Sequence, residues 1–596
     1  KNNLAAKFIM NGGTISGCES KTHGGGIKSQ GIVEMHGGTI KNGNAVRGGG
    51  VFVTGVTGKF KMTGGSIEDC IATRNYADNN TKERIFTNGA GGGVFVELGG
   101  DFEMHGGTIK NCSTSSTEES MTIATLAYPT NRGGGVFVSA YAGEGAANIS
   151  NPNNHSYRGR FWFNKGLIEN CESGVGGGVC VHTTVTRNIA GANGRFTMES
   201  GAEIRNCKSK YPPGNDKYGG GGVFIAGNGT VAGGLKGVFN MRGGSITACT
   251  AIGNGGGVKC NGEMNMKDGC VIDHCSCVGG IPDSYQYSHA YGGGIHLYNA
   301  TFDMKGGTIK NETAFSGGGV MAWGTKGVFT MDGANAIISD NFVSGVNGSG
   351  NGGGVYVQEA TFNFEDGTIT RNIASRYGGG ININKTATLN LNGICHITYN
   401  KANSGGAISQ EAGGCVIDIK SDGVLIEGNE AIDVGTGYES WATARGQGGG
   451  ILIEKGTFRM SKGKIINNTA SGRGGGVSCY VRRILGDVTA EITGGEISGN
   501  SGGESGGGIN LYADRTYNAS EDELNGDNHL NDVKVKLTGG ILRFNSVKNG
   551  DGGGIYVGIN PDNSIDTMTI ETSYTESTIY GNTATYNGGA IGLNHG

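Results

Sequence analysis

Proline is almost absent from this chain: there are only 6 among 596 residues, against 121 glycines. So little proline argues against a disordered linker, and glycine at about a fifth of the residues is far from the strict one-in-three pattern of collagen. No apolar run approaches the roughly 18–20 residues that a membrane-spanning helix needs. Charged residues make up 16% and the formal net charge is −4, so we expect the chain neither to bind nucleic acid nor to insert into a membrane.

The chain contains many copies of one short sequence motif, a run of glycines followed by valine or isoleucine, which we call the glycine word. The word is GGG except before Ile408 and Ile591, where it is GGA. Its apolar residue lies at Ile27, Val51, Val94, Val136, Val179, Val223, Val258, Ile295, Val320, Val355, Ile381, Ile408, Ile451, Val477, Ile509, Ile555 and Ile591. Seventeen copies of a short unit indicate a solenoid, in which each unit buries its apolar face only against its neighbours.

Each unit has the pattern of three short strands separated by glycine corners. The unit that begins at Val51 contains the segments VFV, FKM and SIEDC, which alternate apolar and polar residues, and the closest copies are 24 to 27 residues apart. No segment shows a helical period, so the glycine words lack the strand–loop–helix context of a nucleotide-binding loop. We predict an all-β fold, a single right-handed parallel β-helix of about seventeen rungs with three short strands each, its handedness following from the crossover rule.

We expect this β-helix to occupy residues 1–596 as one continuous domain. Residues 1–10 already belong to a repeat, and Gly596 lies inside another. Because a solenoid needs capping units to cover its apolar ends, the sequence suggests part of a longer chain, or a unit that stacks end to end with other copies into a filament.

In most units a thiol or a small polar residue lies three positions after the isoleucine of the third strand. The series is Cys18, Cys70, Cys112, Cys171, Cys207, Cys249 and Cys275, then Asn341, Asn372, Asn400, Asn429, Asn468, Asn500 and Asn582. Stacked asparagines can hydrogen-bond from rung to rung as a ladder. Stacked thiols would form a small apolar ladder whose spacing permits disulfides without requiring them.

A zinc site is the alternative for some of these thiols. Its ligands would be Cys260, Cys270, Cys275 and Cys277. We disfavour it because Cys275 belongs to the series above and Cys260 replaces a core valine. The sequence therefore leads us to expect neither a metal nor a cofactor.

The longer units carry insertions on either side of the first strand, whereas the turn between the second and third strands hardly varies. The insertions lie at 73–90, 113–132, 139–160, 182–195, 208–219, 226–237, 276–291, 430–447 and 512–532. Insertions gathered on one face of a repeat protein usually build its binding surface.

The alternation also predicts that the central residue of each first strand points outward, and many of these residues are aromatic. The candidate binding residues are Phe52, Phe95, Phe137, Phe224, His296, Met321, Tyr356 and Tyr556. Because large exposed apolar patches tend to mark contacts, we predict a groove for a glycan or a protein, floored by this column and walled by the insertions. Two alternatives stay open: the insertions cover and bury the column, or the column makes a lateral contact with another protein.

The unit I-x-x-N-x-A-x-x-x-G-G-[G/A]-[V/I], found at Ile369–Ile381 and Ile579–Ile591, gives the chain a family resemblance. It resembles the repeats of polymorphic outer-membrane proteins and of large adhesin-like β-helical surface proteins, although GGG dominates over GGA here. The resemblance covers essentially the whole chain and implies secretion, display outside the cell or at its surface, and an adhesive or structural role. Partners implied by such a role are a glycan, or a protein on a host or neighbouring surface.

An enzyme is the rival interpretation, because many parallel β-helices degrade polysaccharides as lyases or hydrolases. Such sites need carboxylates, or carboxylates with lysine or arginine, on neighbouring rungs. The best candidates are Lys259 and His296, overhung by Asp283, Tyr285 and Tyr287. We expect a non-catalytic protein, because an active site usually interrupts a repeat locally and this repeat is regular.

Overall fold

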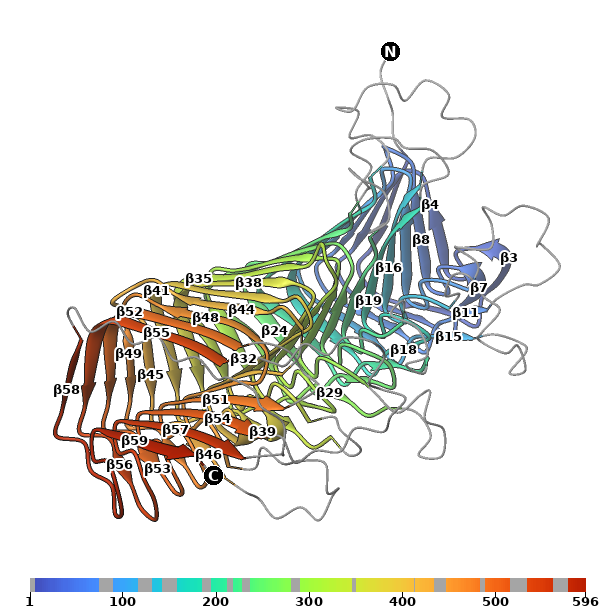
Figure 1. The fold of residues 1–596 in the computed structure, drawn as a ribbon. Helices are drawn as coiled ribbons and strands as arrows, with labels where there is room; N and C mark the ends of the chain where they lie inside the picture. Colours follow the sequence, from blue (N-terminus) through green and yellow to red (C-terminus); the bar gives the residue numbers. More distant parts are fainter. Residues whose placement is uncertain are drawn as a thin grey trace. The chain divides into compact units, whose positions relative to one another are not determined.

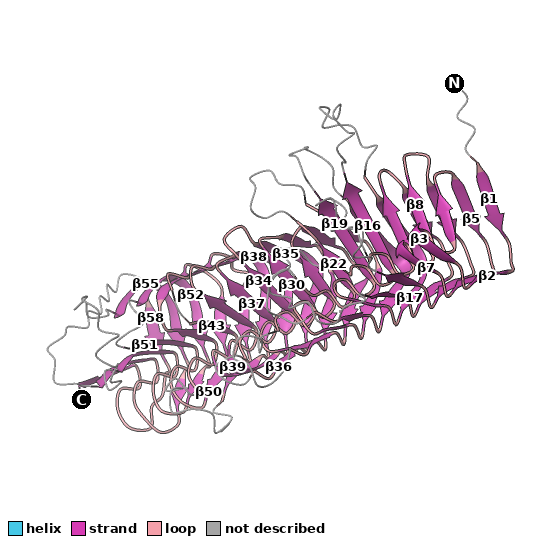
Figure 2. Cartoon of the chain, turned by 90° about the vertical axis from the view of Figure 1, so that its right-hand side faces the viewer, coloured by secondary structure: helices cyan, strands magenta, loops and turns pink. Residues whose placement is uncertain are grey.

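The computed structural model describes residues 6–73, 89–115, 131–141, 158–184, 194–211, 218–227, 236–279, 290–345, 350–411, 413–432, 446–482, 488–514, 533–560 and 577–595. Every regular element in these ranges is a strand (Figure 2). Among the described residues, no helix is long and apolar enough to span a membrane. The chain divides into two compact units, Lys1–Ala314 and Phe315–Gly596.

Every glycine word leads directly into a strand, as the sequence predicts. In the first unit these strands are β4 (Ile27–Ser29), β8 (Val51–Thr54), β12 (Val94–Glu97), β16 (Val136–Tyr141), β19 (Val179–Thr184), β22 (Val223–Ile225), β26 (Val258–Cys260) and β30 (Ile295–Tyr298). In the second unit they are β34 (Val320–Trp323), β37 (Val355–Gln358), β40 (Ile381–Asn384), β43 (Ile408–Gln410), β47 (Ile451–Ile453), β51 (Val477–Arg482), β54 (Ile509–Asp514), β57 (Ile555–Asn560) and β59 (Ile591–His595). Within each unit these strands pair in parallel, as β4 and β8 do (Figure 1). Equivalent residues lie side by side, as Phe95 lies beside Phe52.

The rung that begins with β8 shows how the chain winds. After β8 come β9 (Lys59–Met62), β10 (Ser66–Glu68) and β11 (Ile71–Thr73), and each pairs in parallel with its equivalent in the next rung. β8 lies in one sheet, β9 and β10 in a second, and β11 in a third. The fold is therefore a parallel β-helix with three sheets. The strand after the cysteine or asparagine corner, β11 in this rung, is an element that the sequence alternation did not single out.

The inward residues of these strands form the core of the first unit. In the β8 rung none of them is more than 1% exposed, and they are Val51, Val53, Phe60, Met62, Ile67, Cys70 and Ala72. Phe60, Phe102 and Phe161 stack from rung to rung with ring centroids 4.9 and 4.7 Å apart. Because a fully buried phenylalanine contributes about 1.5–3 kcal/mol, this stack is a large part of what holds the rungs together.

The first two glycines of the triple glycine form a corner with no room for a side chain, whereas the third position is alanine before Ile408 and Ile591. Gly48 has a φ of 66°, in the left-handed region that a side chain disfavours. A Cβ on Gly49 would lie 2.4 Å from the carbonyl oxygen of Ile71, and one on Gly50 would lie 2.8 Å from that of Gly93. The glycines are therefore required for the corner and for the close approach of neighbouring rungs.

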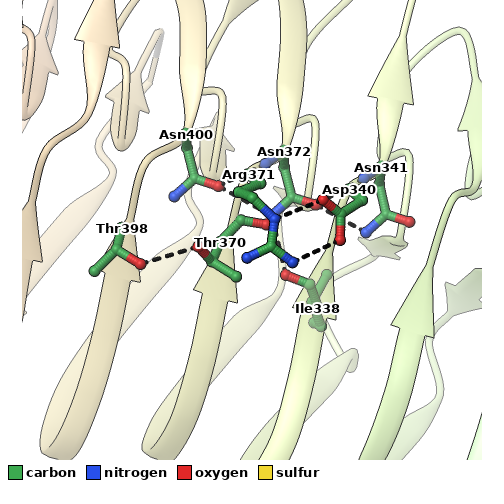
Figure 3. A network of polar contacts seen from close by, with 8 residues as sticks. All are labelled: Ile338, Asp340, Asn341, Thr370, Arg371, Asn372, Thr398 and Asn400. Atoms are coloured by element: carbon green, nitrogen blue, oxygen red, sulfur yellow. Dashed lines mark hydrogen bonds and ion pairs between the residues drawn. The ribbon is translucent and has the colours of Figure 1, made fainter.

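In the second unit, buried asparagines form a hydrogen-bonded row at the corner after the third strand (Figure 3). The amide nitrogen of Asn341 donates to Oδ1 of Asn372 at 2.8 Å, and Asn372 donates in the same way to Asn400 at 3.0 Å. The backbone N–H of each asparagine donates to the same oxygen. The same pattern continues from Asn400 to Asn582.

In the first unit this position is a thiol in all rungs but two, which have Gly43 and Glu312 there. The Cys112 thiol donates to the carbonyl oxygen of Ile67 at 3.7 Å, as the Asn372 amide donates to Ile338 at 3.0 Å in the second unit. Cysteine and asparagine thus satisfy the same kind of backbone acceptor at this corner. All fourteen cysteines are free thiols.

The four cysteines of the zinc alternative do not converge on one point. Cys270, Cys275 and Cys277 donate to three different carbonyl oxygens, those of Met241, Ile246 and Gly292. Among the described residues, no group of three or more potential ligands could hold a metal ion.

Candidate functional site

The column predicted on the outside of the first strands is buried, so the exposure expected from the alternation is wrong. All eight predicted binding residues have at most 7% of their surface exposed: Phe52, Phe95, Phe137, Phe224, His296, Met321, Tyr356 and Tyr556. In the first unit, the residues that bury the column come from the same rungs. The residue just before a glycine word packs back over this face, and Ala90 and Val175 belong to the same buried cluster as the phenylalanines.

We call Phe52, Phe95, Phe137 and Phe224 the covered column. Phe95 lies between two neighbours, with ring centroids 5.3 Å from Phe52 and 4.8 Å from Phe137. The sheet of first strands therefore has a buried apolar layer on each face here. Most residues of the insertions, which were expected to wall a groove, lie outside the described residues, so their part in binding stays a prediction.

The pair considered for catalysis, Lys259 and His296, is also buried. Nζ of Lys259 lies 2.6 Å from Nδ1 of His296, and neither residue has any exposed surface. Burial and the Lys259 charge hold the pKa of His296 well below its usual value, so the imidazole is neutral and accepts a hydrogen bond from the ammonium group. Asp283, Tyr285 and Tyr287 lie outside the described residues.

The exposed face of another sheet in the first unit carries a tryptophan. Strands β13 (Asp101–Met104), β17 (Arg160–Glu169) and β20 (Arg195–Arg205) run side by side there, and β17 is labelled in Figure 2. Alternate residues of these strands project outward. Trp162 is 47% exposed, at a position where the two neighbouring rungs have Glu103 and Thr197.

A depression of about 420 Å³ surrounds this indole; we call it the Trp162 depression. Its lining residues are Lys59, Asp101, Phe102, Glu103, Arg160, Phe161, Trp162, Arg195, Thr197 and Arg242. Phe102 and Phe161 belong to the core, so the surface that a ligand would meet is the indole with charged and hydroxyl groups around it. Such a combination of one apolar platform and several convergent polar groups is typical of a ligand site.

Most charges around the depression are held in fixed positions by partners. Arg160 makes two hydrogen bonds to Asp101, from Nε to Oδ1 at 2.5 Å and from Nη2 to Oδ2 at 2.7 Å. Glu103 lies 3.1 Å from Nε2 of His105, whose ring is tilted towards Trp162 with centroids 6.4 Å apart.

Two arginines next to this network have no such partner. Arg195 lies directly beside Arg160 on the neighbouring strand, and within the described residues its side chain makes no ion pair or hydrogen bond. Arg158 is only 9% exposed and its buried Nε has no hydrogen-bond acceptor. Burial, with Arg195 and Arg160 nearby, lowers the pKa of Arg158 from its usual value. The depression therefore has an excess of positive charge close to its tryptophan.

The groups of the depression are better suited to binding a sugar than to catalysing a reaction. The indole face can stack on the apolar face of a pyranose ring, and the fixed polar groups can bind its hydroxyls. Asp101 is held by both guanidinium hydrogen bonds, so it is a poor candidate for proton transfer.

The repeat pattern of the sequence does not single out Trp162. In the second strands, alternation places this position on the outward face, where the equivalent residues Lys61 and Glu103 are charged, and Trp162 is exposed there. The available signal was the one tryptophan at this position, in the segment RFWF, where the other rungs, apart from Ile9 in the first, have polar residues.

Comparison of the chain with protein-family models, with curated proteins and with solved structures finds no match.

Proposed function

We propose that this chain is a non-catalytic, adhesin-like β-helical protein of the cell surface or extracellular space, which binds a glycan in the Trp162 depression. The observation that carries the proposal is the 47% exposed indole among fixed polar groups. The repeat words that resemble surface adhesins support the location. The rigid β-helix supports the role, because it presents the site on paired strands rather than on a loop.

The stacking of the rungs determines how an extended ligand would lie on the site. Neighbouring rungs are about 4.8 Å apart, and outward residues of equivalent rungs lie in line, as Glu103, Trp162 and Thr197 do. An extended saccharide lying across the strands would therefore meet one rung after another, with Trp162 at the centre of the contact.

Affinity electrophoresis through gels that contain soluble neutral and acidic polysaccharides tests the proposal. We expect at least one polysaccharide to retard the protein, and Trp162→Ala to weaken that retardation about tenfold, which corresponds to about 1.4 kcal/mol of stacking. The matched control is Tyr399→Ala, since Tyr399 is 61% exposed and lies in the second unit. Retardation by no polysaccharide, or equal binding by the Trp162 variant, would refute glycan binding at this site.

The same samples separate binding from degradation. Each polysaccharide is incubated with the protein, and new reducing ends and unsaturated products are measured. We expect neither to form. Release of either product, at a rate that Glu103→Gln abolishes, would show instead that the chain is a polysaccharide-degrading enzyme and that the depression is its active site.

A further inference from the structure

We propose that the glycan bound in the Trp162 depression is anionic, and that its carboxylate or sulfate group binds Arg195 with Arg158 beside it. This inference rests on the proposed function, and it adds the chemical class of the ligand and the residues that select it. Four observations support it: the charge of the lining, the pairing of its charges, the burial of Arg158, and the distance from the arginines to the indole.

The lining of the depression is positive although the chain is acidic overall. It contains the cations Lys59, Arg160, Arg195 and Arg242 and the carboxylates Asp101 and Glu103, so four positive charges minus two negative charges leave +2. The whole chain has a formal charge of −4. A positive depression on an acidic protein attracts anions selectively to this place.

The carboxylates of the lining already have partners within the protein. Asp101 accepts both hydrogen bonds of Arg160, and Glu103 contacts His105. Arg242 has its own partner, Glu199, at 3.6 Å. Arg195 is the arginine of the lining that has no ion pair within the described residues, and its five N–H donors are available to a ligand.

The position of Arg195 beside Arg160 favours a bound anion. Like charges directly opposite each other on paired strands destabilise a sheet, and here two arginines are in register. Arg158 adds a third guanidinium, 9% exposed and with a buried Nε that lacks an acceptor. A buried cation without a counter-charge is unfavourable. Arg158 does not itself line the depression, but its charge acts on Arg195 and Arg160, so an oxyanion bound to Arg195 would relieve the repulsion among the three guanidinium groups.

The spacing matches a sugar that carries its own acid group. Arg160 and Trp162 are two residues apart on one face of β17, which is roughly 7 Å, and diagonal neighbours on adjacent strands such as Trp162 and Arg195 are about 7–8 Å apart. A pyranose stacked on the indole would thus place a carboxylate or a sulfate ester, on itself or on the next sugar, within reach of Arg195. An acidic peptide would supply the charge but lacks the flat apolar ring face that the indole can cover.

Two matched pairs of polymers test the inference by affinity electrophoresis: polygalacturonate against its methyl ester, for carboxylate, and dextran sulfate against dextran, for sulfate. We expect the acidic member of at least one pair to bind at least tenfold more tightly than its neutral counterpart. Arg195→Gln should remove most of this preference. Lys165→Gln is the control, because it removes one positive charge from an exposed position on β17 outside the depression, and it should change binding less than twofold.

Each outcome decides a separate question. If a neutral polymer binds as well as its acidic partner and Trp162→Ala abolishes both, glycan binding stands and the anionic ligand is refuted. If both charge variants weaken binding equally, the attraction is a general charge effect and the role of Arg195 is refuted. If no polymer binds, the proposed function itself fails. Equal thermal unfolding of all variants shows that the fold is kept.

Discussion

Replacing Asn400 by alanine tests whether the asparagine row holds the rungs of the second unit together. The Asn400 side chain has no exposed surface and takes part in four hydrogen bonds. It accepts from the backbone N–H and the amide of Asn372, both at 3.0 Å. It donates to the carbonyl oxygen of Ile369 and to Oδ1 of Asn429, also at 3.0 Å.

The magnitude follows from what the truncation leaves behind. The Asn372 amide keeps its bonds to Ile338 and Thr370, but the buried Asn372 N–H loses its acceptor, which costs about 1–3 kcal/mol. The other three bonds contribute about 0.5–1.5 kcal/mol each. We therefore expect Asn400→Ala to lower the free energy of unfolding by about 2.5–7.5 kcal/mol.

Asn400→Cys is the informative companion variant. A thiol at this corner can donate to the same kind of carbonyl, as Cys112 does to Ile67 in the first unit, so cysteine should destabilise the protein clearly less than alanine. Urea unfolding followed by circular dichroism measures both variants, and hydrogen exchange of the Asn372 amide locates the effect. An alanine variant as stable as wild type, or a cysteine variant as unstable as alanine, would refute the reasoning.

Three further changes test other parts of the structure. Phe137→Ala in the covered column should destabilise the protein by about 3–5 kcal/mol in urea unfolding, because Phe137 has no exposed surface; a change below about 1 kcal/mol would mean that the column is not a core. Burial raises the pKa of Glu312 well above 4.5, so its stabilising contribution is complete below pH 4.5 and is lost as the pH rises through the folded-state value. Glu312→Gln should therefore gain stability relative to wild type as the pH increases from 4 to 8, and parallel urea midpoints across this range would contradict the assignment. Iodoacetamide should modify Cys18 alone in the native protein, since the other thirteen thiols are buried, and all fourteen after unfolding; mass spectrometry that finds more modified thiols in the native protein would show that the core opens.

The fold could be predicted from the sequence because its main determinant is steric. A Cβ at Gly49 would lie 2.4 Å from the carbonyl oxygen of Ile71, so the glycine words mark corners regardless of the residues around them. Each of the seventeen words begins a strand. The strand after the corner was not predicted, because segments such as Ile71–Thr73 are too short to show a period.

The site was harder to predict because alternation gives the side of a strand and not what covers that side. In VFV all three residues are apolar, which is also the pattern of a strand buried on both faces; Phe95 and Phe137 are buried because residues such as Ala90 pack over them. The exposure of Trp162 followed from its position, but its use depends on Arg195 and Arg158, which the chain brings together from different rungs.

The covered column has a consequence for how the strands find their alignment. In a sheet with one solvent-exposed face, a shift of the strand register by one residue would expose the apolar side chains to water. This penalty fixes the register. Here Val94 and Phe95 are both buried, so such a slip would exchange two apolar layers and carry little of that penalty. The correct pairing must then be selected elsewhere, by corners such as Gly48–Gly50, where a Cβ on Gly49 would lie 2.5 Å from the carbonyl oxygen of Gly92 in the next rung. The glycine corners therefore fix the register in which each rung pairs with the rung before it.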